Sequence, residues 1–470
     1  MKKLICCFAV ASLLALGGSA IAELCSIEAA PAASLLLPYF AVDYDNPAGV
    51  NTIFTINNAS ATAALAHVVV WSDASVEVLD FNVYLTGYDM QTVNLGLALK
   101  DGLLPITAND PDISNVGAYS VEDGNSYPGC DELGFPYDNE NPPGDGSCGE
   151  VGCARLADIE AILLGDESQL LYPGACGAFG DGDGIAKGYV TVDLVADCTL
   201  QTPCGQGWEN PDQGPYFTGD PETSIGQYDN ILWGDWFMVN GGENFAQGDT
   251  LVHIQAANPA SEVELGLLDN GSFYNRCIAD PSVPTATPYY DYRETLGTHF
   301  AAAYYVNALF TGGTQFMVWR DSTVGSNISA DMTFDCGDVP GWYPIGQRQI
   351  VIFDEEENPV VPEYCQISPC PPGEENNFAP REVNLIDIGE ISPFESGWVY
   401  MNLNESYGAD EPELRQNWVQ TVSSAEGRFS VGLNAIVIAD FCDSIDVEIG
   451  PYDDGFPVVL TAPSPYEIAE

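Results

Sequence analysis

Positive charge is the scarcest feature of this chain of 470 residues. Lysine and arginine total 12 against 69 aspartates and glutamates, which leaves a formal net charge of −57. A chain this acidic repels nucleic acid and anionic lipid, so binding of either by charge is excluded. Three interpretations of the acidity stay open: cation binding, above all of Ca²⁺, adaptation to high salt, or a plain solvated surface.

Signs of catalysis are also scarce. The chain has three histidines, His67, His253 and His299, each beside apolar residues, where we expect a packed ring rather than a catalytic base. There is no Gly-x-Ser-x-Gly elbow and no Cys-x-x-Cys-His sequence, and we expect neither a haem nor a nucleotide cofactor. A Ser-His-Asp triad stays open, because its members meet in space rather than in sequence.

The N-terminus has the pattern of a cleaved export signal. Two lysines precede an apolar stretch, 4–16, and a small-x-small site follows that ends at Ala22. We expect residues 1–22 to be removed and the mature chain to reach the periplasm, the cell surface or the extracellular space. No later run of 18 apolar residues predicts a transmembrane helix.

Cysteine usage agrees with an oxidising compartment. Cys6 and Cys7 lie in the leader, and the other twelve of the 14 cysteines form an even set, as expected for disulfides. Their spacing and the shortage of histidine do not suit zinc sites. The pairing itself stays open. The disulfide candidates are Cys25, Cys130, Cys148, Cys153, Cys176, Cys198, Cys204, Cys277, Cys336, Cys365, Cys370 and Cys442.

Short alternating apolar runs, broken by Gly, Asn, Asp and Pro, predict an all-β protein. Helical signal is sparse, and its clearest piece is 154–164, where apolar residues recur at helical spacing. This helix lies in a Gly-, Pro- and Cys-rich stretch, about 102–187, which we interpret as a long, mostly irregular insertion. The strand-like runs are 51–57, 65–71, 79–85, 188–195, 236–239, 251–255, 314–319, 349–353, 397–403 and 428–439.

A proline-rich stretch, 280–288, predicts a linker between two domains, 23–279 and 289–470. Eight mature cysteines precede it and four follow, so each side can pair internally. The strand-like segments also repeat in order: NTIFTINN, AHVVVWSD, QTVNL and GYVTVDL, then TQFMVWRD, QIVIFDEE, EVNLIDI and GWVYMNL. This order predicts a duplicated β-sandwich, with convergent use of similar strands as the alternative.

The strand order resembles, in general style, immunoglobulin-like sandwich modules of bacterial surface and secreted proteins. The resemblance covers the strands only and rests on no specific motif. It implies two immunoglobulin-like β-sandwich domains, of which the first carries the cysteine-rich insertion.

Two acidic, turn-rich loops are the best metal candidates. Asp43, Asp45 and Asn46 lie on one loop, and Asp181 and Asp183 on the other. Closely spaced carboxylate and amide oxygens on Gly-rich loops are the ligands that Ca²⁺ prefers. Neither loop matches an EF-hand, and Asx and Gly residues also form turns for backbone reasons, which is the alternative.

Aromatic residues suggest a second kind of site, because secreted β proteins that bind glycans stack sugars on exposed rings. Trp208, in the loop-like CGQGWENPD segment, is the first candidate for such a ring. The other candidates are Trp233, Trp236, Trp342 and Trp398. Tryptophans within strand-like runs are more often core residues, and this applies to Trp71, Trp319 and Trp398.

These features predict a secreted or envelope-associated, non-enzymatic β protein with a structural, adhesive or assembly role. Disulfides, with Ca²⁺ as a candidate, would stabilise it. The expected partners are other copies of the chain or a cell-surface glycan. The alternative is a glycan-binding module or a glycoside-active enzyme, although two nearby carboxylates are no signal in a chain with 69 acids.

Overall fold

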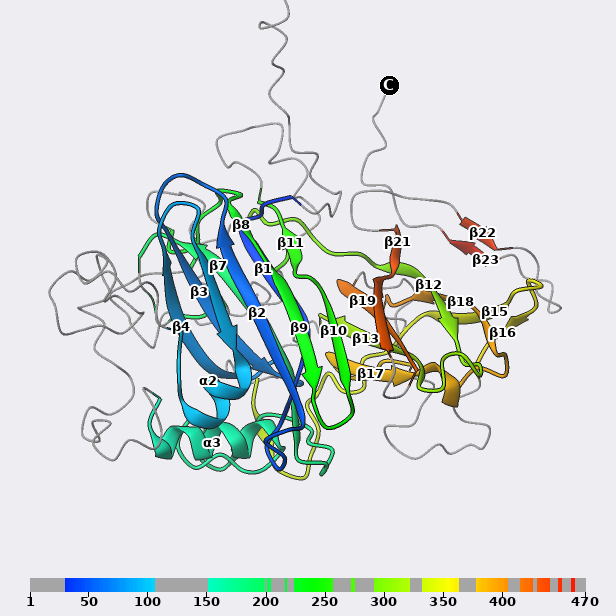
Figure 1. Cartoon of the computed structure of the whole chain (residues 1–470), viewed down its shortest axis with the longest axis horizontal. Helices are drawn as coiled ribbons and strands as arrows, with labels where there is room; N and C mark the ends of the chain where they lie inside the picture. Colours follow the sequence, from blue (N-terminus) through cyan, green and yellow to red (C-terminus); the bar gives the residue numbers. More distant parts are fainter. Residues whose placement is uncertain are drawn as a thin grey trace, which may run out of the picture.

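The computed structural model confirms a mostly β protein built from antiparallel sheets (Figure 1). Most described strands fall into two groups, one before residue 257 and one after residue 290, called here the first and the second repeat. The described residues are 30–105, 151–197, 199, 201–203, 216–217, 224–256, 272–274, 291–321, 332–362, 378–404, 415–425, 429–439, 447–449 and 458–460.

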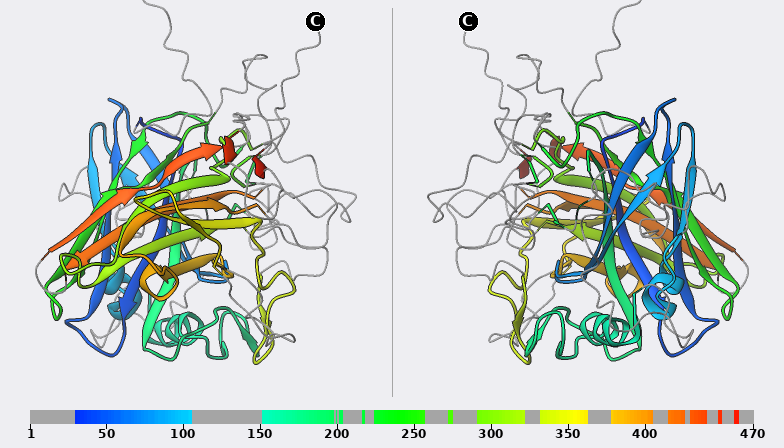
Figure 2. Two further views of the ribbon diagram at one scale, coloured as in Figure 1. Left: turned by 90° about the vertical axis from the view of Figure 1, so that its right-hand side faces the viewer. Right: turned by 90° about the vertical axis from the view of Figure 1, so that its left-hand side faces the viewer.

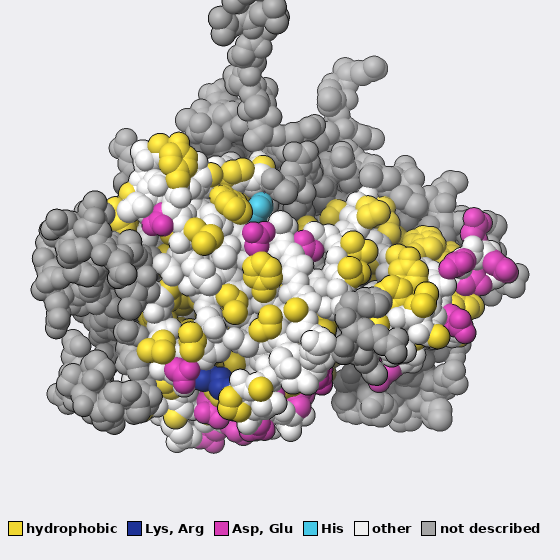
Figure 3. All heavy atoms as spheres, in the orientation of Figure 1, with side chains coloured by type: hydrophobic (Ala, Val, Ile, Leu, Met, Phe, Trp, Pro, Cys, Tyr) yellow, Lys and Arg dark blue, Asp and Glu magenta, His cyan; other side chains and the backbone are white. Residues whose placement is uncertain are grey.

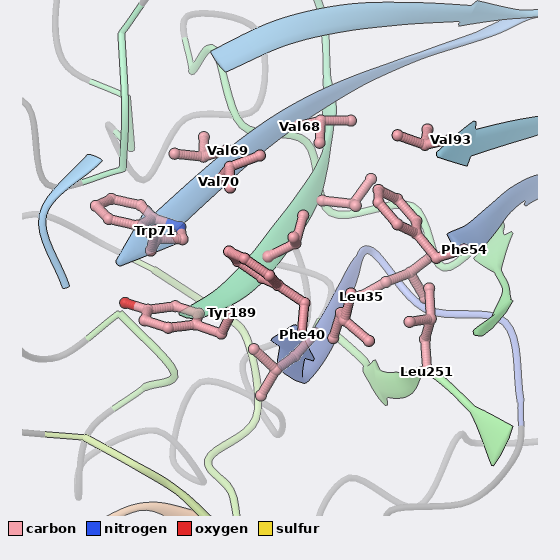
Figure 4. Packing of buried hydrophobic residues seen from close by; sticks show 14 of the residues in the cluster. Leu35, Phe40, Phe54, Val68, Val69, Val70, Trp71, Val93, Tyr189 and Leu251 are labelled. Atoms are coloured by element: carbon pink, nitrogen blue, oxygen red, sulfur yellow. The ribbon is translucent and has the colours of Figure 1, made fainter. Parts of the chain in front are cut away.

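The first repeat consists of two facing sheets. The β7 sheet has the order β11-β1-β7-β3-β4, and the β2 sheet has the order β10-β9-β2-β5, with β8 paired to β2. Between them, Leu35 and Phe40 meet Phe54, Val93 and Leu251 (Figure 4). The strands are β1 (Ser34–Asp43), β2 (Val50–Asn58), β3 (Ala64–Ser72), β4 (Glu77–Leu85), β5 (Met90–Asn94), β7 (Ile185–Val195), β8 (Leu232–Trp233), β9 (Asp235–Asn240), β10 (Phe245–Thr250) and β11 (Val252–Ile254).

The second repeat also has two sheets. The β18 sheet has the order β16-β15-β18-β12-β21, and the β13 sheet has the order β17-β13-β19-β20. Its core includes Phe300, Phe316 and Met401. The strands are β12 (His299–Tyr305), β13 (Gly313–Arg320), β15 (Gln349–Asp354), β16 (Pro359–Val360), β17 (Val383–Asp387), β18 (Ser396–Asn402), β19 (Asn417–Ala425), β20 (Phe429–Asn434) and β21 (Ile436–Ala439). A separate hairpin pairs β22 (Val447–Ile449) with β23 (Val458–Leu460).

The two repeats have the same topology. In chain order, β1, β2, β3, β4, β5, β7, β9, β10 and β11 correspond to β12, β13, β15, β16, β17, β18, β19, β20 and β21, and each keeps its sheet neighbours. A side-chain contact repeats as well. Thr52 Oγ1 bonds the backbone N and O of Ala41, both at 3.0 Å, and Thr314 Oγ1 bonds those of Tyr305 at 2.9 and 3.2 Å. The predicted duplication is confirmed in topology.

The literal Val-Asn-Leu match that suggested the duplication is out of register. Asn94 caps helix α2 (Leu95–Asp101) by accepting a hydrogen bond from a first-turn N–H. Asp387 caps the short 3-10 helix η2 (Ile388–Glu390) in the same way. Since both caps end the edge strand beside β2 or β13, Asn94 corresponds to Asp387 and not to Asn384.

The connection after this short helix differs between the repeats. In the second repeat it is 391–395, whereas in the first it extends from residue 102 to β7. The predicted insertion therefore belongs to one specific connection of the first repeat. Its last residues, 185–187, are part of β7 rather than irregular, which corrects the expected boundary.

Helix α3 (Cys153–Leu163) confirms the helix predicted at 154–164. Leu156, Ile159 and Leu163 face the core of the first repeat, as their spacing requires. The rest of the insertion between 106 and 150 lies outside the described residues, as do the leader and the 280–288 stretch. Among the helices that the structure describes, none has the length and apolar character needed to cross a membrane.

The β7 sheet is buried on both faces. All nine residues of β3 are buried, which is why its sequence is an almost continuous apolar run. One face packs on the β2 sheet. The other packs on the second repeat, whose Met317, Trp319 and Trp418 belong to the same hydrophobic cluster. Figure 2 looks along this stack, and in its left view the strands of the second repeat lie in front of those of the first. The β2, β7, β13 and β18 sheets therefore stack in this order through the molecule. Each buried Val or Leu side chain stabilises the folded state by about 1.5–3 kcal/mol.

Candidate functional site

The two loops predicted to bind Ca²⁺ lie side by side. Asp43 at the end of β1 pairs with Ile185 at the start of β7, because these strands are antiparallel neighbours. The backbone N of Tyr44 donates to the carbonyl of Gly184 at 2.9 Å. The two loops were predicted separately from the sequence, and the fold brings them together.

Their carboxylates already have partners. Asp43 Oδ1 accepts hydrogen bonds from the backbone N of Asp45 at 3.0 Å and of Asn46 at 2.8 Å, which forms an Asx turn. Lys187 Nζ lies 2.6 Å from Asp181 and 2.9 Å from Asp183. Within the described ranges, no group of three or more His, Cys, Asp or Glu side chains is arranged to hold a metal ion. Ca²⁺ binding stays a prediction.

Arg381 links these acids to the second repeat. Its guanidinium lies 2.9 Å from Asp181 and 3.3 Å from Asp73, and 4.9 Å from the ring centroid of Phe179. Burial raises the pKa of Asp73 to about 6, although the Arg381 charge and the backbone N–H of Phe179 act in the opposite direction. Hydrogen bonding to Lys187 and the charge of Arg381 lower the pKa of Asp181 against the effect of its partial burial.

A disulfide fastens the same side of the molecule. Cys176 of β6 (Ala175–Cys176) bonds Cys336, beside β14 (Phe334–Asp335), and these two short strands pair. The bond joins the two repeats, so the expectation that each side of the 280–288 stretch pairs internally is wrong for this pair. An even number of cysteines on each side of the 280–288 stretch could not reveal this bond, because the insertion folds back onto the second repeat. Cys153 is also disulfide-bonded, and the other candidate cysteines lie outside the described residues.

A second ionic network is fully buried between the repeats. Arg293, with no exposed surface, lies 3.3 Å from Asp193 of β7 and 3.1 Å from Asp291. Asp193 also accepts hydrogen bonds from the hydroxyls of Tyr216 at 3.1 Å and Tyr274 at 2.7 Å. Burial raises the pKa of Asp291 even though Arg293 opposes it. Such a network stabilises the fold only because every charge has a partner.

Ser34, Asp193 and His67 lie in one row across β1, β7 and β3. The aspartate stands between the other two residues, and the Ser34 hydroxyl contacts Asp193 and Arg293 rather than an imidazole. A catalytic serine needs a base as its direct neighbour. This row is therefore part of the buried network and has no nucleophile.

All three histidines are packed, as the sequence predicted. His67, His253 and His299 are 0 %, 6 % and 4 % exposed. Burial lowers the pKa of each ring, and for His299 the charge of Arg348 adds to burial and gives a pKa of about 4. Burial and the lowered pKa values keep these rings neutral and packed near pH 7.

The tryptophans divide between core and surface. Trp71 and Trp319 are core residues, as predicted, and the candidate Trp236 is buried too. Trp398 is partly buried and stacks on Phe353 at 4.3 Å. Trp342 is partly buried in a ring cluster with Phe179, and Trp208 lies outside the described residues. Among the candidates, Trp233 is exposed, at 40 %.

Trp233 belongs to an outward set of side chains on the β2 sheet. Asn57 of β2 pairs with both Met90 and Trp233, and Thr55 lies on the same side of β2. Phe237 is four residues after Trp233 on the same face and is 50 % exposed. We call these five residues, Thr55, Asn57, Met90, Trp233 and Phe237, the β9 face. Sequence reasoning missed Met90 and Phe237, whose apolar character gave no sign of exposure.

Phe237 lies across the sheet rather than pointing away from it. Gly248 of β10 is directly opposite, and a Cβ at Gly248 would come within 2.8 Å of the Phe237 ring. The glycine thus leaves space for the ring, whose outer side remains open to a partner. Figure 3 shows apolar side chains spread over this surface with few acidic ones, whereas acids gather at the lower edge and the far right.

No family model, curated protein or solved structure matches this chain. Its function therefore has to be inferred from the contact between the repeats and from the exposed β9 face.

Proposed function

We propose that the chain is an exported, non-enzymatic protein with a structural or assembly role, and that its two repeats act as one rigid body. The observation that carries the proposal is the hydrophobic contact between the repeats, which is continuous with the core of the first repeat. The ring of Trp319 lies 5.8 Å from Tyr189 and 5.6 Å from Phe273. Domains that move against each other have smaller and more polar interfaces.

Polar and covalent bonds support the same contact. Gln416 Nε2 donates to the carbonyls of Ser272 at 2.9 Å and Phe273 at 3.2 Å. The Cys176–Cys336 disulfide and the ion pairs of Arg381 add links on another side. A catalytic cleft between domains would need space for a substrate, whereas rings and paired charges fill this contact.

We further propose that each repeat is an immunoglobulin-like sandwich, within domains 23–279 and 289–470 joined by a linker at 280–288. The strand neighbours support this. In one sheet β1 lies beside β7, and β7 beside β3, while in the other β2 lies beside β9, and β9 beside β10. These neighbours follow the B-E-D and G-F-C arrangement of immunoglobulin sandwiches.

Light scattering on the mature protein tests the assembly role. It is measured after size exclusion with Ca²⁺ and again with a chelator, at fixed ionic strength. Growth into large species supports the role, and growth only with Ca²⁺ would assign a function to the acidic loops of β1 and β7. A monomer in both conditions and over a range of concentrations would overturn the proposal.

A further inference from the structure

We propose that the β9 face of one copy docks on the β12 edge of the β18 sheet of a second copy, so that chains join head to tail. The contact would repeat, between copies, the contact that joins the two repeats within one chain. Head-to-tail joining rests on the proposed assembly role and identifies the two surfaces that carry it.

The β9 face occupies the positions that the second repeat uses to contact the first. Asn57 pairs with Trp233 as Trp319 pairs with Trp418, and the other positions follow from the same registers. All five counterparts are buried in the hydrophobic cluster shared by the two repeats. Thr55, Asn57, Met90, Trp233 and Phe237 correspond in order to Met317, Trp319, Val383, Trp418 and Val422.

In the first repeat this surface has no partner among the described residues. Met90 is 60 % exposed, Trp233 40 % and Phe237 50 %. Their counterparts Val383, Trp418 and Val422 are 4 %, 6 % and 2 % exposed. Three of the five positions are thus covered in the second repeat and open in the first, whereas Asn57 is 3 % exposed. The second repeat shows what kind of surface covers them.

That covering surface is the outer face of the β7 sheet, where β1 lies against β13 and β17. Its counterpart in the second repeat is the outer face of the β18 sheet, where β12 takes the place of β1. We call its outward residues Ala301, Ala303, Tyr305 and Ile436 the β12 face. Ala303 is exposed, Tyr305 is 38 % exposed and Ile436 is 70 % exposed, so the β12 face is also open. Val351 and Tyr400, at the centre of the same sheet face, are buried in a separate hydrophobic cluster, so the open part is the edge formed by β12 and β21.

The two open faces differ from each other and belong to the two outermost sheets of the molecule. A contact between unlike faces is heterologous. A pair of bound copies therefore still has one free β9 face and one free β12 face, at which further copies can bind. Repetition then gives an open chain of copies, or a ring if the rotation between copies closes.

The scarcity of charge on the β9 face favours its use in a contact between copies. Two chains of net charge −57 repel each other, and a stable contact has to avoid acids. Among the outward residues of β2, β5, β8, β9 and β10, Asp235 alone carries a charge. Its counterpart at the internal contact is Gln420, which is 2 % exposed. Apolar joining should therefore strengthen with salt, which screens the remaining repulsion.

The test is light scattering of the mature protein at about 0.1 M and about 1 M NaCl, between which the screening length falls about threefold. The variants are Trp233→Gln on the β9 face and Ile436→Gln on the β12 face. Leu170→Gln is the matched control, because Leu170 is 54 % exposed on the loop after α3. Circular dichroism verifies that each variant is folded.

We expect the wild type and the control to grow with salt, and each face variant to associate at least about tenfold more weakly. A mixture of the two face variants should form a dimer and stop there, because each supplies the intact face that the other lacks. Asp235→Gln, which copies the internal contact, should strengthen wild-type association.

Other results would overturn the inference in distinct ways. Assembly that neither face variant weakens would reject head-to-tail joining but leave the assembly role intact, and a wild type that never associates would reject both. Failure of the mixed variants to form a dimer would reject joining of unlike faces. A last outcome concerns glycans. If the wild type stays monomeric but is retarded in a gel that contains a neutral polysaccharide such as hydroxyethylcellulose, and Trp233→Gln is not retarded, the occupant of the β9 face is a glycan and not a second copy.

Discussion

The Arg381→Met variant is expected to lose stability in a way that depends on pH. Arg381 is the cation nearest to Asp73, and the buried carboxyl of Asp73 has a pKa of about 6 even with this partner. Its ordinary pKa is 3.8, so the folded protein binds the proton more tightly than the unfolded chain does. The stability that Asp73 contributes is therefore fully present below about pH 4 and is lost as the pH rises through about 6.

Removal of the guanidinium leaves the Asp73 carboxylate without its closest countercharge above pH 6. Loss of one partner of a buried pair costs about 3–5 kcal/mol, and the partial exposure of Arg381, 26 %, reduces the expected cost to about 2–3 kcal/mol at about pH 7.5. At about pH 5 the carboxyl is already protonated in the folded wild type, so the cost should fall below about 1 kcal/mol.

Urea unfolding at the two pH values measures both costs. The double variant Asp73→Asn/Arg381→Met completes the cycle, and at about pH 7.5 it should recover at least about 1 kcal/mol relative to Arg381→Met. A cost that is equal at both pH values would refute the reasoning, because the buried carboxylate would then not be its source.

Three further predictions concern the same contact and the buried rings. Replacement of Cys176 and Cys336 by alanine should lower the free energy of unfolding by about 4–5 kcal/mol, because the bond closes a loop of 160 residues, and an unchanged denaturation midpoint would contradict this. Arg293→Met leaves two buried aspartates unpaired and should cost at least about 3–5 kcal/mol, visible as lost near-ultraviolet circular dichroism or earlier unfolding in urea; native-like stability would contradict it. Since the pKa of His299 falls from 6.5 to about 4 on folding, its contribution is present above pH 6.5 and is lost as the pH falls to about 4. His299→Gln should therefore flatten the decline of stability in that interval, and an unchanged slope would refute this.

The strands that the sequence predicted well are those with a clear apolar pattern, such as β3, β7 and β13. Strand β1 was missed because its SLLLPYFAVD sequence neither alternates nor avoids proline. A register shift between Leu37 and Phe40 explains how the sheet tolerates Pro38. Strand β12, with three consecutive alanines, and strand β19, which is largely polar, gave similarly weak signals.

The candidate surface was harder to predict than the fold. Trp233 and Trp236 looked alike in sequence, and only their register separates them, because an odd spacing places them on opposite faces of the sheet. Arg293 gave no sign of its partner Asp193, since the two are distant in the chain and meet only when the repeats pack. Pairing across repeats depends on the whole fold, which local patterns do not contain.

Electron microscopy of the mature protein at about 1 M NaCl, where the screening length is about 3 Å, tests the central claim most directly. The account predicts unbranched strings or closed rings in which each unit is one whole chain, with neighbouring units related as the two repeats are within a chain. Isolated single chains at every protein concentration tested, including the highest, would contradict it.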